Sequence, residues 1–173
     1  MGKHKTDKSL ILKGRVRVVP VANVDTDMIF HNKHLHITEP EEMAPYIFGN
    51  LQGWESFPQE AKLGDILIVG HNFGCGSSRQ QAVDGFIALG VSAIIGVSFG
   101  AIYKRNAINA GLPLIEYPEV LESGIQDLDE IELNLETGTI KDINGKILVN
   151  GKPFTDVQRD IYFAGGLLKL IND

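Results

Sequence analysis

The sequence predicts one α/β domain, with a parallel β-α-β core and a set of short antiparallel strands. Its 173 residues correspond to a single domain of ordinary size. Between residues 66 and 116, short apolar runs alternate with helix-like stretches, an order that implies parallel strands joined by right-handed crossovers. After residue 130, short β-branched runs are separated by Thr-Gly and Asn-Gly, and Asn-Gly is a strong signal for a hairpin turn.

The first third of the chain begins with a strand and then becomes irregular. Residues 12–19 alternate and are rich in β-branched side chains, so they predict a strand that Pro20 ends. Residues 23–27 (NVDTD) form a polar loop. A Thr followed by Glu-Pro-Glu-Glu indicates a helix over residues 38–48, because Thr is a capping residue and Pro and acids favour the first turn. Residues 50–63 show no regular pattern.

The middle of the chain carries the alternating elements. Apolar runs predict three strands, and the stretches between them predict two helices. We expect the strands at 66–69, 91–96 and 113–116, and the helices at 79–89 and 99–110. Each helix is followed by a glycine, Gly90 or Gly111, which is the residue preferred just beyond a helix end.

The last third of the chain predicts short strands and a final helix. The strands are expected at 130–135, 139–142 and 146–150. Asp156 or a neighbour is expected to cap a helix over 157–163, which precedes two glycines and a short apolar tail. Residues 1–11 begin with a polar stretch that lacks the apolar core of a secretory signal. We expect them to form a flexible N-terminal arm, and residues 12–173 to form the single domain.

The composition of the chain excludes several classes of protein. Apolar residues make up 43% and charged residues 22%, which is typical of a soluble globular protein. The net charge of −6 opposes binding to a nucleic-acid backbone. No apolar run approaches the ~20 residues that a membrane-spanning helix needs. The single cysteine cannot form an internal disulfide and fits a reducing compartment. We therefore expect a cytoplasmic protein that binds neither nucleic acid nor membrane.

The strongest candidate for a functional site is the loop Gly70–Arg79 (GHNFGCGSSR), between a predicted strand and a predicted helix. Its glycines let the backbone pass close to a ligand, and a helix N-terminus offers unpaired N–H groups to an anion. Ser77 and Ser78 add hydroxyl groups, while Arg79 adds a cation that can bind a carboxylate through two parallel hydrogen bonds. The loop is therefore suited to a small anion. An equally open interpretation is that Ser78 caps the helix and Arg79 is a solvated residue of its first turn.

Other motif-based functions are disfavoured. The chain has no phosphate-loop string, and the dinucleotide fingerprint needs a glycine where Arg79 stands. Residues 96–100 match the G-x-S-x-G pattern of serine hydrolases, but that architecture needs an acid and then a histidine after the serine. All five histidines precede Ser98. We expect Ser98 to cap the helix that follows.

We expect no metal site in this chain. His31, His34 and His36 have a spacing that suits neither one helical face nor a zinc pattern. Cys75 alone cannot hold an iron–sulfur cluster, which takes several thiolates, and we interpret it as a small residue in a tight turn. The carboxylates of residues 25 and 27 are a candidate pair for catalysis, although turn capping explains one or both equally well.

Three segments together resemble one protein family. Asn23–Asp27 resembles its N-[IV]-D-T-D signature, and Phe73–Arg79 resembles its F-G-C-G-S-S-R loop. Residues 98–113 resemble its S-F-x-x-I-x-x-R-N-x-x-N-x-G-L-P stretch. The family is that of the small subunits of 3-isopropylmalate dehydratase, which are related to the small subunit of homoaconitase and to the swivel domain of aconitase. The resemblance covers residues 14–171 and implies a swivel-domain fold.

The resemblance implies half of an enzyme, a hydro-lyase that is active only with its large subunit. In this family the large subunit carries a [4Fe–4S] cluster, so no cofactor is expected in this chain. The reaction moves a hydroxyl group between adjacent carbons of a 2-hydroxy acid by dehydration and rehydration. By similarity, Ser77 is the base, Asp27 orients the groups around it, and Arg79 and Ser78 bind a substrate carboxylate.

The resemblance also points to leucine biosynthesis, with 3-isopropylmalate as the substrate. Related small subunits commonly read P-x-R-Y-L after the D-T-D signature, in the loop that sets substrate choice. In this chain Lys33 replaces the Arg and His34 replaces the Tyr, so both are candidate substrate-binding residues that differ from the family pattern. Homocitrate-, dimethylmalate- and citramalate-type substrates remain alternatives, as does a non-catalytic swivel module.

Overall fold

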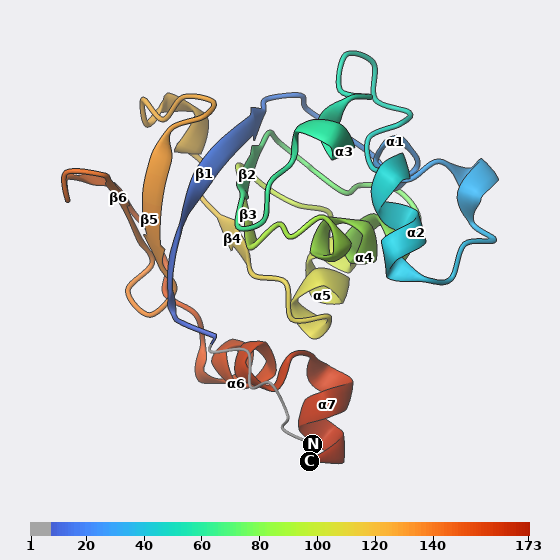
Figure 1. Ribbon diagram of the computed structural model, residues 1–173. Helices are drawn as coiled ribbons and strands as arrows, with labels where there is room; N and C mark the ends of the chain where they lie inside the picture. Colours follow the sequence, from blue (N-terminus) through green and yellow to red (C-terminus); the bar gives the residue numbers. More distant parts are fainter. Residues whose placement is uncertain (1–7) are drawn as a thin grey trace.

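The computed structural model describes residues 8–173, and its centre is a seven-stranded mixed sheet with the order β4-β3-β2-β1-β5-β6-β7 (Figure 1). Its strands are β1 (Ile11–Val19), β2 (Ile66–Val69), β3 (Ala93–Gly96), β4 (Leu114–Glu116), β5 (Glu130–Asn134), β6 (Thr139–Asp142) and β7 (Ile147–Asn150). The first four are mutually parallel, and the last three are antiparallel. The predicted combination of a parallel core and antiparallel strands is confirmed.

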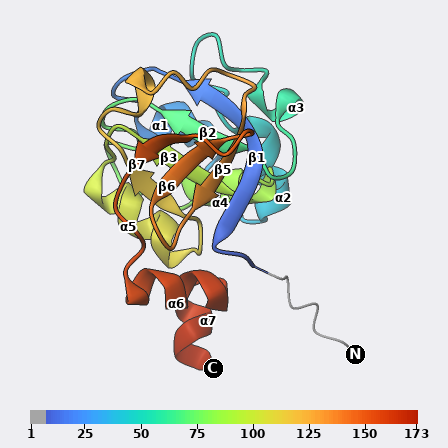
Figure 2. The same cartoon turned by 90° about the vertical axis from the view of Figure 1, so that its left-hand side faces the viewer.

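Strand β1 joins the two halves of the sheet because it pairs differently along its length. Its second half, Val16–Val19, runs parallel to β2 in register with Ile66–Val69. Its first half, Ile11–Arg15, runs antiparallel to β5. The antiparallel strands therefore continue the parallel sheet and curl away from it (Figure 2).

The curl explains why the central strands are apolar on both faces. In β2, Leu67 and Val69 belong to one core cluster together with residues of α4 and α5. Ile66 and Ile68 belong to a second cluster that includes buried residues of β5 and β6. Helices thus cover one face of the parallel strands, and the curled antiparallel half covers the other, which gives the continuous apolar run typical of a doubly covered strand.

Within residues 8–173, seven short α-helices surround the sheet, and several differ from the sequence-based prediction. They are α1 (Thr26–Ile29), α2 (Pro40–Met43), α3 (Phe57–Glu60), α4 (Gln81–Ala88), α5 (Ala101–Asn109), α6 (Asp156–Ala164) and α7 (Leu167–Asn172). The helix predicted over 38–48 is only α2 and a 3-10 turn, because Pro45 lacks the N–H that a longer helix would need. Glu39, not Thr38, precedes its first turn.

The boundaries of the later helices also differ. α4 begins at Gln81 and α5 at Ala101, each later than predicted. Before α4, the Arg79 side chain is held by Asp27 and the Phe30 carbonyl, and before α5, Gly100 N donates to the Phe73 carbonyl. The last helix is capped by Thr155 rather than Asp156, through a capping box with Gln158. The predicted apolar tail is helix α7.

The N-terminal end of the described chain lies against α6. Residues 1–7 of the predicted arm lie outside the described residues. Lys8 Nζ donates a hydrogen bond of 2.9 Å to the carbonyl of Tyr162, and Ile11 already belongs to β1. No helix in residues 8–173 is long and apolar enough to cross a membrane.

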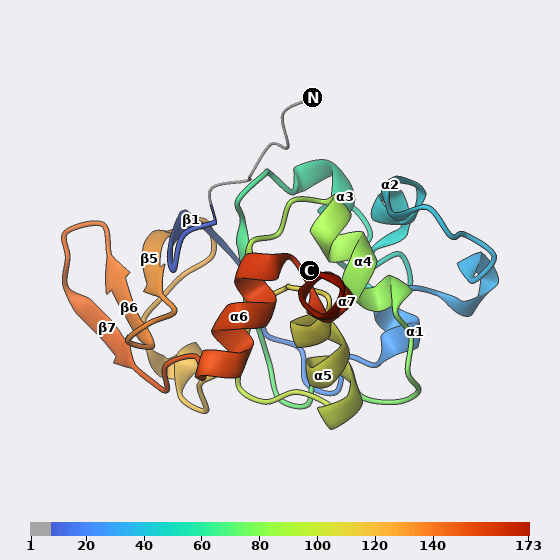
Figure 3. The same ribbon diagram turned by 90° about the horizontal axis from the view of Figure 1, so that it is seen from below.

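The carboxyl ends of the parallel strands and the C-terminal helices lie at opposite ends of the molecule. β1 points away from α6 and α7, which are nearest the viewer when the molecule is seen from below (Figures 1 and 3). Loops at the carboxyl ends of parallel strands are the usual place for a ligand in such sheets. The candidate loop after β2 lies at this end.

Candidate active site

The candidate loop, residues 70–79, lies between two other loops that carry the family motifs. On one edge, Thr26 N donates to Cys75 O at 3.0 Å, and Gly74 N donates to Val24 O at 2.7 Å. On its other edge it pairs with the segment after β3, through Phe73 N to Ser98 O at 3.1 Å and Gly100 N to Phe73 O at 2.9 Å. The loops after β1, β2 and β3 thus continue the order of their strands, which is why motifs far apart in sequence meet here.

Glycines allow helix α5 to approach the loop from behind. Gly74 has φ +78°, and a Cβ there would overlap the ring of Tyr103. A Cβ on Gly100 would lie 2.8 Å from the carbonyl oxygen of Gly74. These two contacts fix the loop directly against the first turns of α5.

Thr26 secures the backbone at the predicted base. Its side chain is buried, and Oγ1 donates a hydrogen bond of 2.9 Å to the carbonyl of Ser77. The sequence reasoning assigned Asp27 of the D-T-D signature but no role to Thr26. The only sequence feature that pointed to Thr26 was its position between Asp25 and Asp27. No neighbouring residue indicates that its side chain bonds to Ser77.

Asp27 and Arg79, both predicted site residues, form an ion pair. Arg79 Nη1 lies 3.0 Å from Asp27 Oδ1 and donates a second bond of 2.6 Å to the carbonyl of Phe30. Asp27 also accepts from the N–H of Asn32 at 2.8 Å and from Asn50 Nδ2 at 3.1 Å. Burial by itself would raise the pKa of Asp27, but these donors outweigh it and the pKa is lowered. Asp27 therefore holds the arginine as a carboxylate.

The ion pair leaves one edge of the Arg79 guanidinium without a hydrogen-bond partner among the described residues. The side chain is only 11% exposed, so Arg79 is not a solvated surface residue. Nη1 makes both of its bonds, whereas Nε and Nη2 make no hydrogen bond to another of residues 8–173. Nε–H and an Nη2–H point the same way on a planar fork, and together they match the two oxygens of a carboxylate.

Ser77 and Ser78 are exposed at the turn before α4, as expected for a loop that acts on an external ligand. Ser78 Oγ accepts a hydrogen bond of 3.0 Å from Asn106 Nδ2 of α5. The Ser77 hydroxyl has no hydrogen-bond partner among the described residues. Neither serine caps α4, whose preceding residue is Gln80 and which has no side-chain cap. The interpretation of Ser78 as a cap is therefore wrong.

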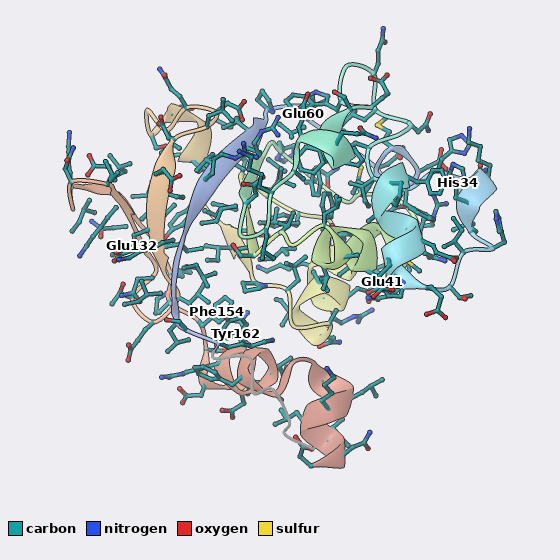
Figure 4. All side chains as sticks on the ribbon, in the orientation of Figure 1. His34, Glu41, Glu60, Glu132, Phe154 and Tyr162 are labelled. Carbon is teal, nitrogen blue, oxygen red and sulfur yellow. The ribbon has the colours of Figure 1, made fainter. Side chains whose placement is uncertain are left out.

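His34, which follows Lys33 in the chain, lies on the side of the molecule away from β5–β7 (Figure 4). Both residues belong to a 3-10 turn, Asn32–His34, in which Lys33 is exposed and the His34 ring stacks on Tyr46 with centroids 3.9 Å apart. Burial, and then the neighbouring Lys33 and histidines, lower the pKa of His34. Within residues 8–173 neither side chain bonds to the loop 70–79, but the turn is tied to the site because Asn32 N donates to Asp27.

Ser98 does not cap α5, as the sequence reasoning expected, because Gly100 stands at that position. Its Oγ accepts the N–H of Asn72 at 2.8 Å and lies 2.7 Å from His71 Nδ1. His71, which precedes Ser98 by 27 residues in the sequence, thus lies beside it in the fold. No carboxylate bonds to His71 in the described part of the chain, so the third member of a hydrolase triad is missing there.

The described residues offer no set of metal ligands. In residues 8–173, no three His, Cys, Asp or Glu side chains are grouped so that they could hold a metal ion. Cys75 is half-buried, and burial, followed by the charge of Asp25, raises the pKa of its thiol. A thiol in this state is a poor ligand and a poor nucleophile. The candidate site therefore consists of an arginine with one unpaired edge, next to two exposed hydroxyl groups in the sequence.

Comparisons with known proteins agree on one family. Residues 39–120 match the family described as the aconitase C-terminal domain. The isopropylmalate/citramalate isomerase small subunit of Methanocaldococcus jannaschii is 43% identical over 158 residues, which cover 91% of this chain and 92% of that protein. The 3-isopropylmalate dehydratase small subunit of Caldicellulosiruptor saccharolyticus is 40% identical, over 94% of this chain and 91% of its own length.

A solved structure shows the same fold. The crystal structure of 3-isopropylmalate dehydratase from Methanocaldococcus jannaschii superposes with a TM-score of 0.83 and 37% sequence identity. The superposition covers 94% of this chain and 93% of that one. The likeness extends over the mixed sheet and its helices and is not confined to the motif loops.

Proposed function

Because the chain belongs to the family of 3-isopropylmalate dehydratase small subunits, we propose that it forms a hydro-lyase with a large subunit and isomerises a 2-hydroxy acid by dehydration and rehydration. The observation that carries the proposal is the Arg79 guanidinium. Asp27 and the Phe30 carbonyl hold its Nη1, while its other edge has no partner among residues 8–173. This is the arrangement that a carboxylate substrate requires next to the exposed Ser77 and Ser78.

The proposal places the [4Fe–4S] cluster on the large subunit. A cluster needs several thiolates, whereas this chain has one cysteine, whose thiol is half-buried and has a raised pKa. The residues of this chain therefore do not fit a cluster. A cluster held by the large subunit would supply a Lewis acid for the hydroxyl group that leaves.

The residues of this chain would handle the proton and the carboxylate. In the dehydration direction, the Ser77 side chain acts as an alkoxide: Oγ takes the proton from the carbon next to a carboxylate and becomes a hydroxyl, and negative charge builds on that carboxylate. The open edge of Arg79 meets the charge as it develops, and preorganised donors of this kind stabilise a transition state strongly. Thr26 fixes the Ser77 backbone, so the base is held in place while its hydroxyl remains exposed.

We propose 3-isopropylmalate as the substrate, which would place the enzyme in leucine biosynthesis. The name of the Caldicellulosiruptor relative supports this choice, whereas the name of the Methanocaldococcus relative includes citramalate. The turn that carries Lys33 and His34 departs from the common P-x-R-Y-L pattern. A citramalate-type substrate, which has a smaller side chain, is therefore the second candidate.

The test is turnover of a panel of 2-hydroxy acids by the chain and the large subunit encoded in the same genome, produced together without oxygen. We expect the purified pair to be brown and to turn over 3-isopropylmalate with a higher kcat/KM than citramalate, dimethylmalate or a homocitrate-type acid. The chain alone should be colourless and inactive. Turnover by the isolated chain would refute the two-subunit proposal, and an active pair that prefers another acid would correct the substrate only.

A further inference from the structure

One face of helix α5 supports the loop 70–79. Gly100, Tyr103 and Asn106 are spaced by three residues, so they lie on one side of the helix axis. Gly100 contacts the Gly74 carbonyl, and Tyr103 packs under Gly74. Tyr103 also donates a hydrogen bond of 2.9 Å from its buried hydroxyl to the carbonyl of Ala82. Loop and helix are therefore fixed relative to each other on both sides of Ser78.

Asn106 is the polar member of this face, and it reaches a predicted site residue. Its Nδ2 donates to Ser78 Oγ at 3.0 Å, across a separation of 28 residues in the chain. A serine hydroxyl carries one proton and two lone pairs. Since the carboxamide occupies one lone pair, the Ser78 proton points elsewhere, and the exposed side of Ser78 faces solvent.

The direction of this bond matters for a substrate that is an anion. A carboxylate only accepts hydrogen bonds, so Ser78 can bind it only by donating its proton. If the carboxamide oxygen faced Ser78, it would accept that proton and turn the Ser78 lone pairs toward the substrate. The observed orientation avoids this conflict and leaves the hydroxyl proton for the ligand.

We propose that Asn106 is a positioning residue, which orients the Ser78 hydroxyl as a hydrogen-bond donor to a substrate carboxylate. The inference rests on the proposed function, and it explains why a polar residue is placed on the face of α5 that supports the loop. Asn106 does not touch the substrate. Its effect on activity passes through Ser78, which gives the proposal a distinct kinetic signature.

The test is a double-mutant cycle measured on the reconstituted two-subunit enzyme. Asn106→Leu removes the carboxamide at nearly constant size, and we expect KM to rise about tenfold with kcat within about twofold, because an interaction made with the bound substrate is lost. Ser78→Ala should raise KM by at least as much. In the Ser78→Ala background, Asn106→Leu should have no further effect, because the group that it positions is gone.

A second substitution tests the direction of the bond. Asn106→Asp keeps the shape but can only accept, so it should capture the Ser78 proton and raise KM more than Asn106→Leu does. The added negative charge also repels the substrate. The rise in KM caused by this repulsion alone is measured by Asn106→Asp in the Ser78→Ala background. Asn109→Leu, the same change one turn further along α5, is the matched control and should leave kcat and KM unchanged.

The outcomes separate this inference from the proposed function. If Asn106→Leu and Ser78→Ala multiply their effects, Asn106 supports the fold of the loop and does not act through Ser78, and the inference is overturned. An Asn106→Leu enzyme with unchanged KM would overturn it as well. Failure of the unsubstituted pair to act on any 2-hydroxy acid would instead refute the proposed function, before any variant is compared.

Discussion

The loop 70–79 and the segment 31–38, which contains the 3-10 turn Asn32–His34 and is called the turn 31–38 below, both bond to Asp27, but they are held very differently. The loop 70–79 is held by backbone hydrogen bonds on both of its edges. It is also held by the buried Thr26 and by the ion pair of Asp27 with Arg79. The second is held by local contacts, such as the bond of 3.1 Å from Lys33 N to His31 Nδ1 and the stacking of His34 on Tyr46. Asn32 connects it to Asp27, and a bond of 3.4 Å from Gln81 Nε2 to the Leu35 carbonyl connects it to the start of α4.

The difference shows how one site can combine fixed chemistry with a variable pocket. Groups that transfer a proton or bind a carboxylate must keep their geometry, and an error of about 1 Å can cost about a hundredfold in rate. Side chains that only enclose the variable part of a substrate can change without moving those groups. We therefore expect changes in loop 70–79 to reduce activity and changes in the turn 31–38 to redirect it.

The largest effect is expected for Ser77→Ala in the two-subunit enzyme. We expect kcat to fall by about 10²- to 10⁴-fold with KM within a few-fold, because a base acts in the transition state and not in binding. Steady-state kinetics with 3-isopropylmalate measures both constants. If the variant kept more than about a tenth of the kcat, a loss below ~1.4 kcal/mol, Ser77 would not be the base. Ser78, whose Oγ accepts the Asn106 bond, would be the next candidate.

Arg79→Lys should have the next largest effect, because it keeps the charge and removes the fork. An ammonium group cannot keep Asp27 and the Phe30 carbonyl bound while also making two parallel bonds to a carboxylate. We expect kcat/KM to fall about thirty- to a thousand-fold, or about 2–4 kcal/mol. The loss should apply to every 2-hydroxy acid in the panel, and a change in substrate preference alone would contradict the role assigned to Arg79.

Lys33→Arg and His34→Tyr restore the common family pattern in the turn 31–38 and should have smaller effects of a different kind. We expect the ratio of kcat/KM for 3-isopropylmalate and citramalate to change several-fold, since one methylene-sized difference in a pocket is worth roughly ten- to two-hundred-fold at most. For the better of the two substrates, kcat/KM should remain within a few-fold of the value for the unsubstituted enzyme. An equal loss on both substrates would show that the turn supports the chemistry itself.

The smallest effect concerns the pH dependence of stability. The pKa of Asp27 is lowered from its ordinary value of 3.8, so the carboxylate stabilises the fold fully above that value, and its contribution is lost as the pH falls through the lower folded pKa. Because the side chain is 40% exposed, the contribution is at most about 1 kcal/mol. The free energies of unfolding of the isolated chain and its Asp27→Asn variant, measured with urea and plotted against pH, should converge below pH 4. A difference independent of pH would contradict the role of the charge.

Local patterns in the sequence were enough for the architecture and for choosing the loop that is the candidate site. Short apolar runs separated by two glycine-ended helices predicted β2, β3 and β4 in parallel order, and Asn144-Gly145 predicted the hairpin between β6 and β7. The glycines and hydroxyl groups of residues 70–79 identified the loop that the structure places at the carboxyl ends of the strands. Such signals depend on neighbouring residues, so one sequence contains them completely.

Only the tertiary structure decided how the site is assembled. The pairs Thr26–Ser77, Asp27–Arg79 and Ser78–Asn106 join residues separated by 51, 52 and 28 positions, and no periodicity connects them. The same holds for β1, whose two halves pair with strands of opposite direction. Helix starts at Gln81 and Ala101 were misjudged because Arg79, through its side chain, and Gly100, through its backbone, bond to distant loops. Contacts between distant segments set these features, because their energies depend on which surfaces the fold brings together.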